Sequence, residues 1–148
     1  MTAIWKLMQG AWIRLYRLSR GRIGGSFGWM GGRMPVLLLT TTGRRTGKRR
    51  TAVLGYLVDG ERYVVVGSNN GEPSDPAWLM NIRSQPRVSI QVRERVLEAT
   101  GSVAEPDDRA RLWAELMRGA PGYGRYETMT TREIPVVILT PTEVAPAA

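Results

Sequence analysis

The 148-residue chain contains no cysteine and no histidine. These two absences exclude cysteine nucleophiles, disulfides, zinc sites built from Cys and His, haem bound through His, and a Ser-His-Asp triad. The remaining metal ligands are 13 carboxylates, and no pair of them has the spacing of a metal site on a helix. If the protein is an enzyme, an organic cofactor is therefore expected to carry the chemistry.

Acidic residues are absent from positions 1–50, which hold 11 Lys and Arg, whereas positions 51–148 hold 10 Lys and Arg against 13 Asp and Glu. The two parts therefore carry formal charges of +11 and −3, within a net charge of +8. This asymmetry predicts an anionic partner for the N-terminal third, such as a phosphate, a membrane surface or a nucleic acid. A solvated, arginine-rich surface is the alternative interpretation.

Residues 3–20 are predicted to form one basic amphipathic helix. Lys6 and Arg14 interrupt its apolar run, so the segment is neither a transmembrane span nor a signal peptide, and we expect a cytoplasmic protein. A basic helix with two tryptophans suits peripheral contact with the inner face of the cell membrane. Docking on the protein's own core, or on a second subunit in a homodimer, fits the pattern equally well. The apolar positions recur at three- and four-residue spacing: Ile4, Trp5, Met8, Trp12, Leu15 and Tyr16.

The rest of the chain reads as one domain. Residues 21–34 contain six glycines and are expected to be a flexible linker, so residues 1–33 stand apart from a domain at 34–141 and a frayed tail at 142–148. Helices are expected over 76–84, with Asp75 as N-cap, and over 107–118. Because tight turns join most of the strands, the pattern predicts an α+β fold whose antiparallel sheet curls into a barrel. The six expected strands are Pro35–Thr42, Arg49–Val58, Glu61–Ser68, Arg87–Arg93, Val96–Val103 and Ile134–Leu139.

Three segments carry candidate binding chemistry. In residues 40–50 (TTTGRRTGKRR), five cations and four hydroxyls surround two glycines, which suits a phosphate or carboxylate; a solvated hairpin tip or a nucleic-acid patch is the alternative. Residues 66–71 (VGSNNG) follow an apolar strand and would let a flat ring approach the backbone, although a plain loop explains them too. In residues 75–81 (DPAWLMN), Trp78 and Asn81 share a helix face and can contact one ligand, unless Trp78 is core.

Read in this order, and followed by PGYGRY at 121–126 and TREIPVVIL at 131–139, these segments resemble the deazaflavin-dependent nitroreductase family. Its members are split β-barrel reductases that use reduced coenzyme F420. The resemblance extends from about residue 34 to 141, with a looser match in the N-terminal helix. It implies a split β-barrel of about six mainly antiparallel strands, with flanking helices and an amphipathic N-terminal helix.

The resemblance also implies which residues bind coenzyme F420, whose polyanionic phospholactyl-oligoglutamate tail suits the cations of residues 44–50. This chain has Val53 where members often have Pro, Asn69 where they often have Lys, and Ala120 where they often have Tyr. The implied binding residues are Arg44, Arg45, Thr46, Arg50, Thr51, Ala52, Val53, Leu54 and Gly55 around the basic turn, Val66, Gly67, Ser68 and Asn69 at the strand end, and Ala77, Trp78, Leu79, Met80 and Asn81 on the helix.

The implied activity is hydride transfer from F420H2 to a small electrophilic acceptor of the quinone, nitroaromatic or enone type. Ser68 is expected to donate a hydrogen bond to a developing oxyanion or to the deazaflavin edge. Tyr123 and Tyr126 are expected to line the acceptor pocket, with a surface latch as their alternative role. Two other functions stay open, an FMN-dependent reductase or oxidase of the same fold and a non-catalytic F420 carrier. Nucleic acid is not expected, because the aromatics are not interleaved with the basic turn.

Overall fold

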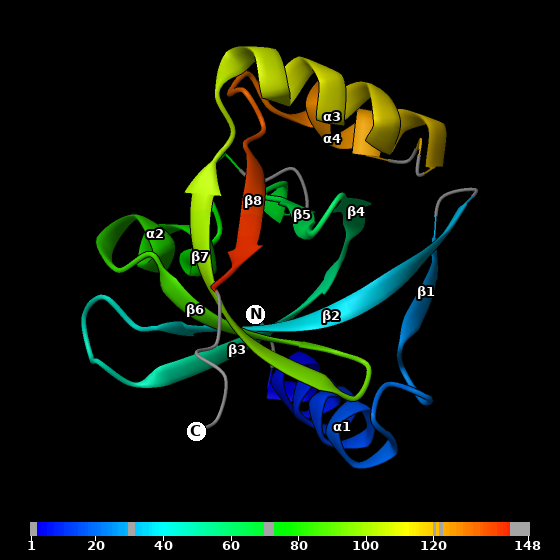
Figure 1. Ribbon diagram of the computed structural model, residues 1–148, viewed down its shortest axis with the longest axis vertical. Coiled ribbons are helices and arrows are strands. Elements are labelled where there is room, and N and C mark those ends of the chain that lie inside the picture. Colours follow the sequence, from blue (N-terminus) through cyan, green and yellow to red (C-terminus); the bar gives the residue numbers. More distant parts are fainter. Residues whose placement is uncertain (1–2, 30–31, 70–72, 120, 122, 143–148) are drawn as a thin grey trace.

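A computed structural model gives the structure of residues 3–29, 32–69, 73–119, 121 and 123–142, in which a curled sheet is flanked by helices (Figure 1). Helix α1 lies below the sheet in this view, and α3 and α4 lie together above it. The elements are α1 (Ala3–Ser19), β1 (Ser26–Trp29), β2 (Gly32–Thr42), β3 (Arg49–Gly55), β4 (Leu57–Asp59), β5 (Arg62–Val66), α2 (Ala77–Ser84), β6 (Arg87–Val92), β7 (Arg95–Val103), α3 (Pro106–Gly119), α4 (Tyr123–Met129) and β8 (Val136–Pro141).

All strand pairs of the described sheet are antiparallel, in the order β1-β2-β6-β7-β8-β5-β4, with β3 also paired to β2. Strands β3 and β4 are consecutive parts of one chain segment, separated only by Tyr56. Since β3 pairs with β2 and β4 pairs with β5, this bent segment connects two distant strands of the order and closes the curl. The predicted α+β class with a curled antiparallel sheet is confirmed.

Local details differ from the expectations in three places. The strand expected over Arg49–Val58 bends at Tyr56, whose backbone N–H donates to the Pro35 carbonyl at 3.1 Å. The glycine-rich segment expected to be a linker contains β1. This strand pairs with β2, and Ser26 lies opposite Pro35 in the register. Helix α2 has Pro76 at its N-cap position without a side-chain cap, so the N-cap expected at Asp75 is wrong. The Asp75 carboxylate instead pairs with two arginines.

The continuous apolar runs of the strands are explained by packing on both faces of the sheet. Leu37 and Leu39 belong to the barrel interior, while the alternate residues Val36 and Leu38 are buried on the opposite face, in the cluster that contains Tyr16 of α1. Strand β5 divides in the same way, with Val64 and Val66 in the cluster beneath α3. Alternate side chains of a strand point to opposite faces, so a strand covered on both sides must be apolar throughout.

Helix α1 docks on the outer face of the barrel. Tyr16 is fully buried, and its hydroxyl donates to the Val36 carbonyl at 2.9 Å and accepts from the Arg93 backbone N–H at 2.8 Å. The Trp12 indole N–H donates to the Gly24 carbonyl at 2.8 Å. Because these polar contacts accompany apolar packing of Trp12 and Ile13, one face of the helix is fixed to the protein's own core.

Candidate active site

Helix α2 holds the basic turn, residues 43–48, through the side chain of Asn81. The Asn81 amide oxygen accepts the Arg44 backbone N–H at 3.1 Å, and its amide nitrogen donates to the Thr41 hydroxyl at 3.0 Å. Asn81 is 6% exposed and Thr41 is fully buried. Both functional groups of this amide are therefore used inside the protein, and the start of the turn is fastened to α2.

The end of β5 approaches the same helix. The Gly67 backbone N–H donates to the Pro135 carbonyl at 2.9 Å. A Cβ atom on Gly67 would lie 3.1 Å from Pro135 Cγ and 3.2 Å from Leu79 Cδ2, which is tighter than ordinary packing. Residue 67 thus lies directly against α2 because it is glycine. The three segments singled out in the sequence meet around one short helix in their described parts, residues 40–50, 66–69 and 75–81; residues 70 and 71 lie outside the described part of the chain.

The basic turn is closed by its own backbone and leaves its cations exposed. Gly43 N–H donates to the Lys48 carbonyl at 2.8 Å, and Gly47, with a φ of +70°, donates to the Gly43 carbonyl at 2.8 Å. Among the described residues, no ion pair includes a cation of this turn or of the start of β3. Such uncompensated charge attracts an anionic ligand. The exposed cations are Arg44, Arg45, Lys48, Arg49 and Arg50.

The strand end at Ser68 and Asn69 is held by two further side chains. Asn69 adopts a φ of +48°, in the left-handed region that Asn tolerates, and its amide donates to the Ser74 carbonyl at 3.0 Å. The Arg132 guanidinium donates to the carbonyls of Gly67 at 3.1 Å and Ser68 at 3.0 Å. Asn69 therefore helps to hold the loop that follows the strand end. Sequence reasoning missed Arg132, although it lies within the TREIPVVIL segment that was part of the resemblance.

Several predicted binding residues have side chains that are committed to the core. Val53 packs against the α1 cluster, Val66 lies beneath α3, and Leu79 is fully buried in the barrel. The Thr51 hydroxyl is 2.8 Å from the Thr40 hydroxyl. These residues can therefore offer a ligand their backbone N–H and C=O groups. Val53 and Leu54 are only partly buried. The predicted residues left partly or fully exposed are Arg44, Arg45, Thr46, Arg50, Thr51, Ala52, Val53, Leu54, Gly55, Asn69, Ala77, Trp78 and Met80.

Of the three predicted catalytic residues, the structure describes the side chain of Ser68 only. Ser68 is 9% exposed and lies at the strand end beside α2. Tyr123 and Tyr126 fall within α4, but their side chains lie outside the described residues, as does the whole of Ala120. The tyrosine roles therefore stay predictions. The described residues contain no group of three or more Asp or Glu that could hold a metal ion.

Comparisons with known proteins agree with this arrangement. The sequence model of the F420H2-dependent quinone reductase family matches residues 11–141. An F420H2-dependent quinone reductase of Mycobacterium tuberculosis is 40% identical over 129 residues, covering 85% of each chain. The solved structure of an F420H2-dependent reductase, FDR-A, superposes with a TM-score of 0.65 at 36% identity, covering 71% of this chain and 93% of that one.

A second solved structure, described as a domain-swapped dimer, has a TM-score of 0.67 at 30% identity and covers 93% of this chain and 99% of its own. The sheet order, the three segments around α2 and these relatives agree on the split-barrel reductase fold. The chain belongs to the F420H2-dependent quinone reductase family.

Proposed function

We propose that this protein is a reductase that transfers a hydride from F420H2 to a quinone. The observation that carries this proposal is the junction at α2, where an exposed turn of unpaired cations meets a strand end that is tightly packed against the same helix. Family membership supplies the cofactor and the acceptor class. The FMN-dependent alternative has no support from these relatives, which are named for F420.

The residues present fit a polyanionic deazaflavin. Arg44, Arg45 and Arg50 are exposed and can bind the phosphate and carboxylates of the tail by charge-assisted hydrogen bonds. Ser68 at the strand end and Trp78 on α2 would border the ring. When bound, F420H2 supplies a hydride from C5 of its deazaflavin. In that complex the Ser68 hydroxyl would donate a hydrogen bond to the acceptor's developing oxyanion or to the ring edge.

The acceptor side of the site is assigned to α4. Tyr123 and Tyr126 both belong to this helix and are three residues apart in the sequence. Helix α4 directly precedes the segment that carries Arg132, which contacts the strand end at Ser68. This connection supports the proposal that the tyrosines line the acceptor pocket and supply a stacking wall or a proton.

We also propose that α1 brings the enzyme to an anionic membrane surface, where lipophilic quinones dissolve. The helix has a second apolar face, which lies next to the side that carries the docked residues Trp12 and Tyr16. Its members are strongly exposed, with Leu7 at 74% and Leu18 at 84%. The exposed face comprises Ile4, Leu7, Met8, Ala11, Leu15 and Leu18.

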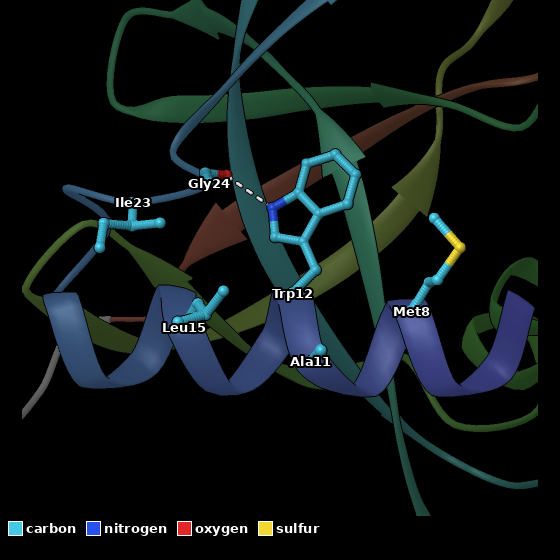
Figure 2. A pocket seen from close by; sticks show the side chains of 6 residues that line it. All are labelled: Met8, Ala11, Trp12, Leu15, Ile23 and Gly24. Carbon is cyan, nitrogen blue, oxygen red and sulfur yellow. Dashed lines mark hydrogen bonds between the residues drawn. The ribbon is translucent and has the colours of Figure 1, made fainter. Parts of the chain in front are cut away.

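A shallow apolar hollow lies on this face, where Met8, Ala11 and Leu15 of α1 meet Trp12 and the segment that carries Ile23 and Gly24 (Figure 2). The exposed cations Arg14 and Arg17 lie at the edge of this face by helical spacing, and the first 50 residues contain no acid. Apolar side chains flanked by cations match the interface of an anionic bilayer. No helix in the described part of the chain is long and apolar enough to cross a membrane. The contact we propose is therefore peripheral, on the cytoplasmic side.

The cofactor proposal is tested by fluorescence titration with F420. We expect quenching with micromolar affinity or better, and a loss of about 100-fold in the double variant R44A/R50A because two charge-assisted contacts are removed. The double variant R95A/R118A is the control, since it removes the same charge at exposed positions far along the chain. Equal affinity of both double variants and the wild type would refute a role for the turn, and FMN uptake in place of F420 would refute the cofactor.

The membrane proposal is tested by pelleting with vesicles of phosphatidylglycerol and with vesicles of phosphatidylcholine. The variant L7S/L18S keeps the docked face of α1 and is expected to lose binding to the anionic vesicles while keeping turnover of a water-soluble quinone. Deleting α1 would be a poorer test because Tyr16 is part of the core. If L7S/L18S pellets like the wild type, the membrane proposal fails. If it instead converts a homodimer to a monomer in sedimentation experiments, the face is a subunit interface.

A further inference from the structure

Arg132 reaches the candidate site from the segment between α4 and β8. Its side chain is only 17% exposed, and within the described residues its guanidinium contacts Asp75, Gly67 and Ser68. One terminal nitrogen pairs with the Asp75 carboxylate at 2.9 Å, and the other donates to the carbonyls of Gly67 at 3.1 Å and Ser68 at 3.0 Å. This one side chain therefore links the strand end, the start of α2 and the approach to β8.

The contact with two successive carbonyls fixes the direction of two peptide groups. In a trans peptide the C=O and N–H bonds point in opposite directions, and the described backbone contains no cis peptide. The Gly67 carbonyl shares its peptide with the Ser68 N–H, and the Ser68 carbonyl shares its peptide with the Asn69 N–H. Both N–H groups consequently point away from Arg132, and within the described residues neither has a hydrogen-bond acceptor.

The conformation of Asn69 fits a binding role for this pair. Its φ of +48° places a left-handed residue directly after Ser68. Successive backbone N–H groups next to a left-handed residue form a small concavity that binds anionic or electron-rich oxygen atoms. The Asn69 side chain, by donating to the Ser74 carbonyl at 3.0 Å, holds the loop in this conformation.

Asp75 in turn fixes Arg132. Its second carboxylate oxygen accepts from Arg83 on α2 at 2.6 Å, so the carboxylate is held between two guanidinium groups and is 18% exposed. A planar guanidinium can meet a carboxylate on one edge and carbonyls on another, whereas a lysine ammonium is a single point of charge on a flexible stem. The geometry at this position therefore requires arginine specifically.

We propose that Arg132 is a positioning residue for the cofactor. By holding the Gly67 and Ser68 carbonyls, it turns the Ser68 and Asn69 N–H groups outward as a donor pair for an electron-rich carbonyl or ring nitrogen of the deazaflavin. This inference rests on the proposed function, which puts the deazaflavin at this strand end. It assigns a task to a residue that does not itself touch the ligand.

The test is the variant R132K, measured by fluorescence titration against two probes. One probe is F420, and the other is the same deazaflavin without its phosphate-bearing tail. Because the donor pair serves the ring, R132K is expected to weaken both probes by the same factor, about tenfold for the loss of two oriented hydrogen bonds. R44A/R50A is expected to weaken F420 alone.

Arg109 provides a matched control. It is also 17% exposed, and its guanidinium holds the Ile134 carbonyl at 2.8 and 3.1 Å and pairs with Glu133 at 3.0 Å, but it does not contact the strand end. R109K is expected to lower the thermal midpoint about as much as R132K does, with both probe affinities kept within twofold of the wild type.

The outcomes separate the two hypotheses. Wild-type affinity in R132K, or an equal loss in R109K, overturns the positioning role while leaving the proposed function standing. A wild type that binds neither probe overturns the proposed function and this inference with it. If R132K does not fold, D75N replaces it, with R83Q as its control. D75N is expected to lower the affinity for both probes, and R83Q is expected to lower neither. Equal affinities in the two variants would overturn the positioning role.

Discussion

Replacing Asn81 with leucine is expected to damage both the stability of the protein and its hold on the cofactor. The substitution leaves a buried Thr41 hydroxyl and the Arg44 backbone N–H without the partners they have at 3.0 and 3.1 Å. A buried polar group that loses its partner costs about 1–3 kcal/mol, so two such losses amount to roughly 2–4 kcal/mol after partial access of water to the exposed turn. For a domain of this size, that is a drop of roughly 6–12 °C in the thermal midpoint.

The assay combines urea denaturation with F420 titration. Three comparison variants separate the causes. R44A keeps the backbone contact to Asn81 and is expected to lose affinity without losing stability. The double variant N81L/T41V lacks both the amide and the hydroxyl. It should be more stable than N81L, because the Thr41 hydroxyl is no longer buried without a partner.

The variant N81D makes the sharpest distinction. A carboxylate can still accept the Arg44 N–H and a hydrogen bond from the Thr41 hydroxyl, but it adds a negative charge beneath the cationic turn. We expect F420 affinity to fall more than in R44A, because the added charge opposes every anionic group of the tail. The reasoning is refuted if N81L unfolds within 0.5 kcal/mol of the wild type, or if N81D binds F420 as tightly as the wild type does.

Two further results are expected from the structure. Hydrogen bonds from Arg111 and Arg62 lower the pKa of Asp59 to about 2. The contribution of Asp59 to stability is therefore complete above the ordinary carboxyl pKa near 4 and is lost as pH falls from there toward 2. Urea denaturation across that range should show the free energy of unfolding falling more steeply with pH in the wild type than in D59N, and parallel slopes would contradict the assignment. Gly67→Ala should lower stability by about 1–2 kcal/mol because the added Cβ would crowd Pro135 and Leu79, whereas Gly119→Ala, whose Cβ meets nothing within 4 Å, should not.

Particular residues show how far the sequence alone could go. The strand pattern predicted the curled antiparallel sheet, because period and turn residues are local properties. The pattern did not predict the break at Tyr56 or the strand at Ser26–Trp29. At both places pairing with β2, and not the local sequence, decides the structure. The resemblance assigned the three candidate binding segments to one cofactor, but it could not separate Asn81, whose amide is used internally, from Arg44, whose side chain is exposed.

The N-terminal helix illustrates the same limit in another way. The spacing of its apolar positions predicts one stripe, yet Trp12 and Tyr16 pack on the barrel while Ile4, Met8 and Leu15 remain exposed. A helix of this length can carry two neighbouring apolar faces, and periodicity does not say which one meets the core. Only the tertiary contacts, such as the buried hydroxyl of Tyr16, distinguish them.

The basic turn keeps its positive charge because no acidic side chain anchors it in the described structure. The basic turn is held by a neutral amide, Asn81, and by backbone contacts, whereas acids such as Asp59 and Asp75 pair with arginines outside the turn. A carboxylate anchor would fix the turn equally well, but it would cancel part of the field that draws a polyanion. Exposed, unpaired cations cost little folding energy because water solvates them, yet together they attract a charged ligand from a distance. The neutral anchor thus allows one segment to be both rigid and strongly positive, which binding of a flexible polyanionic tail requires.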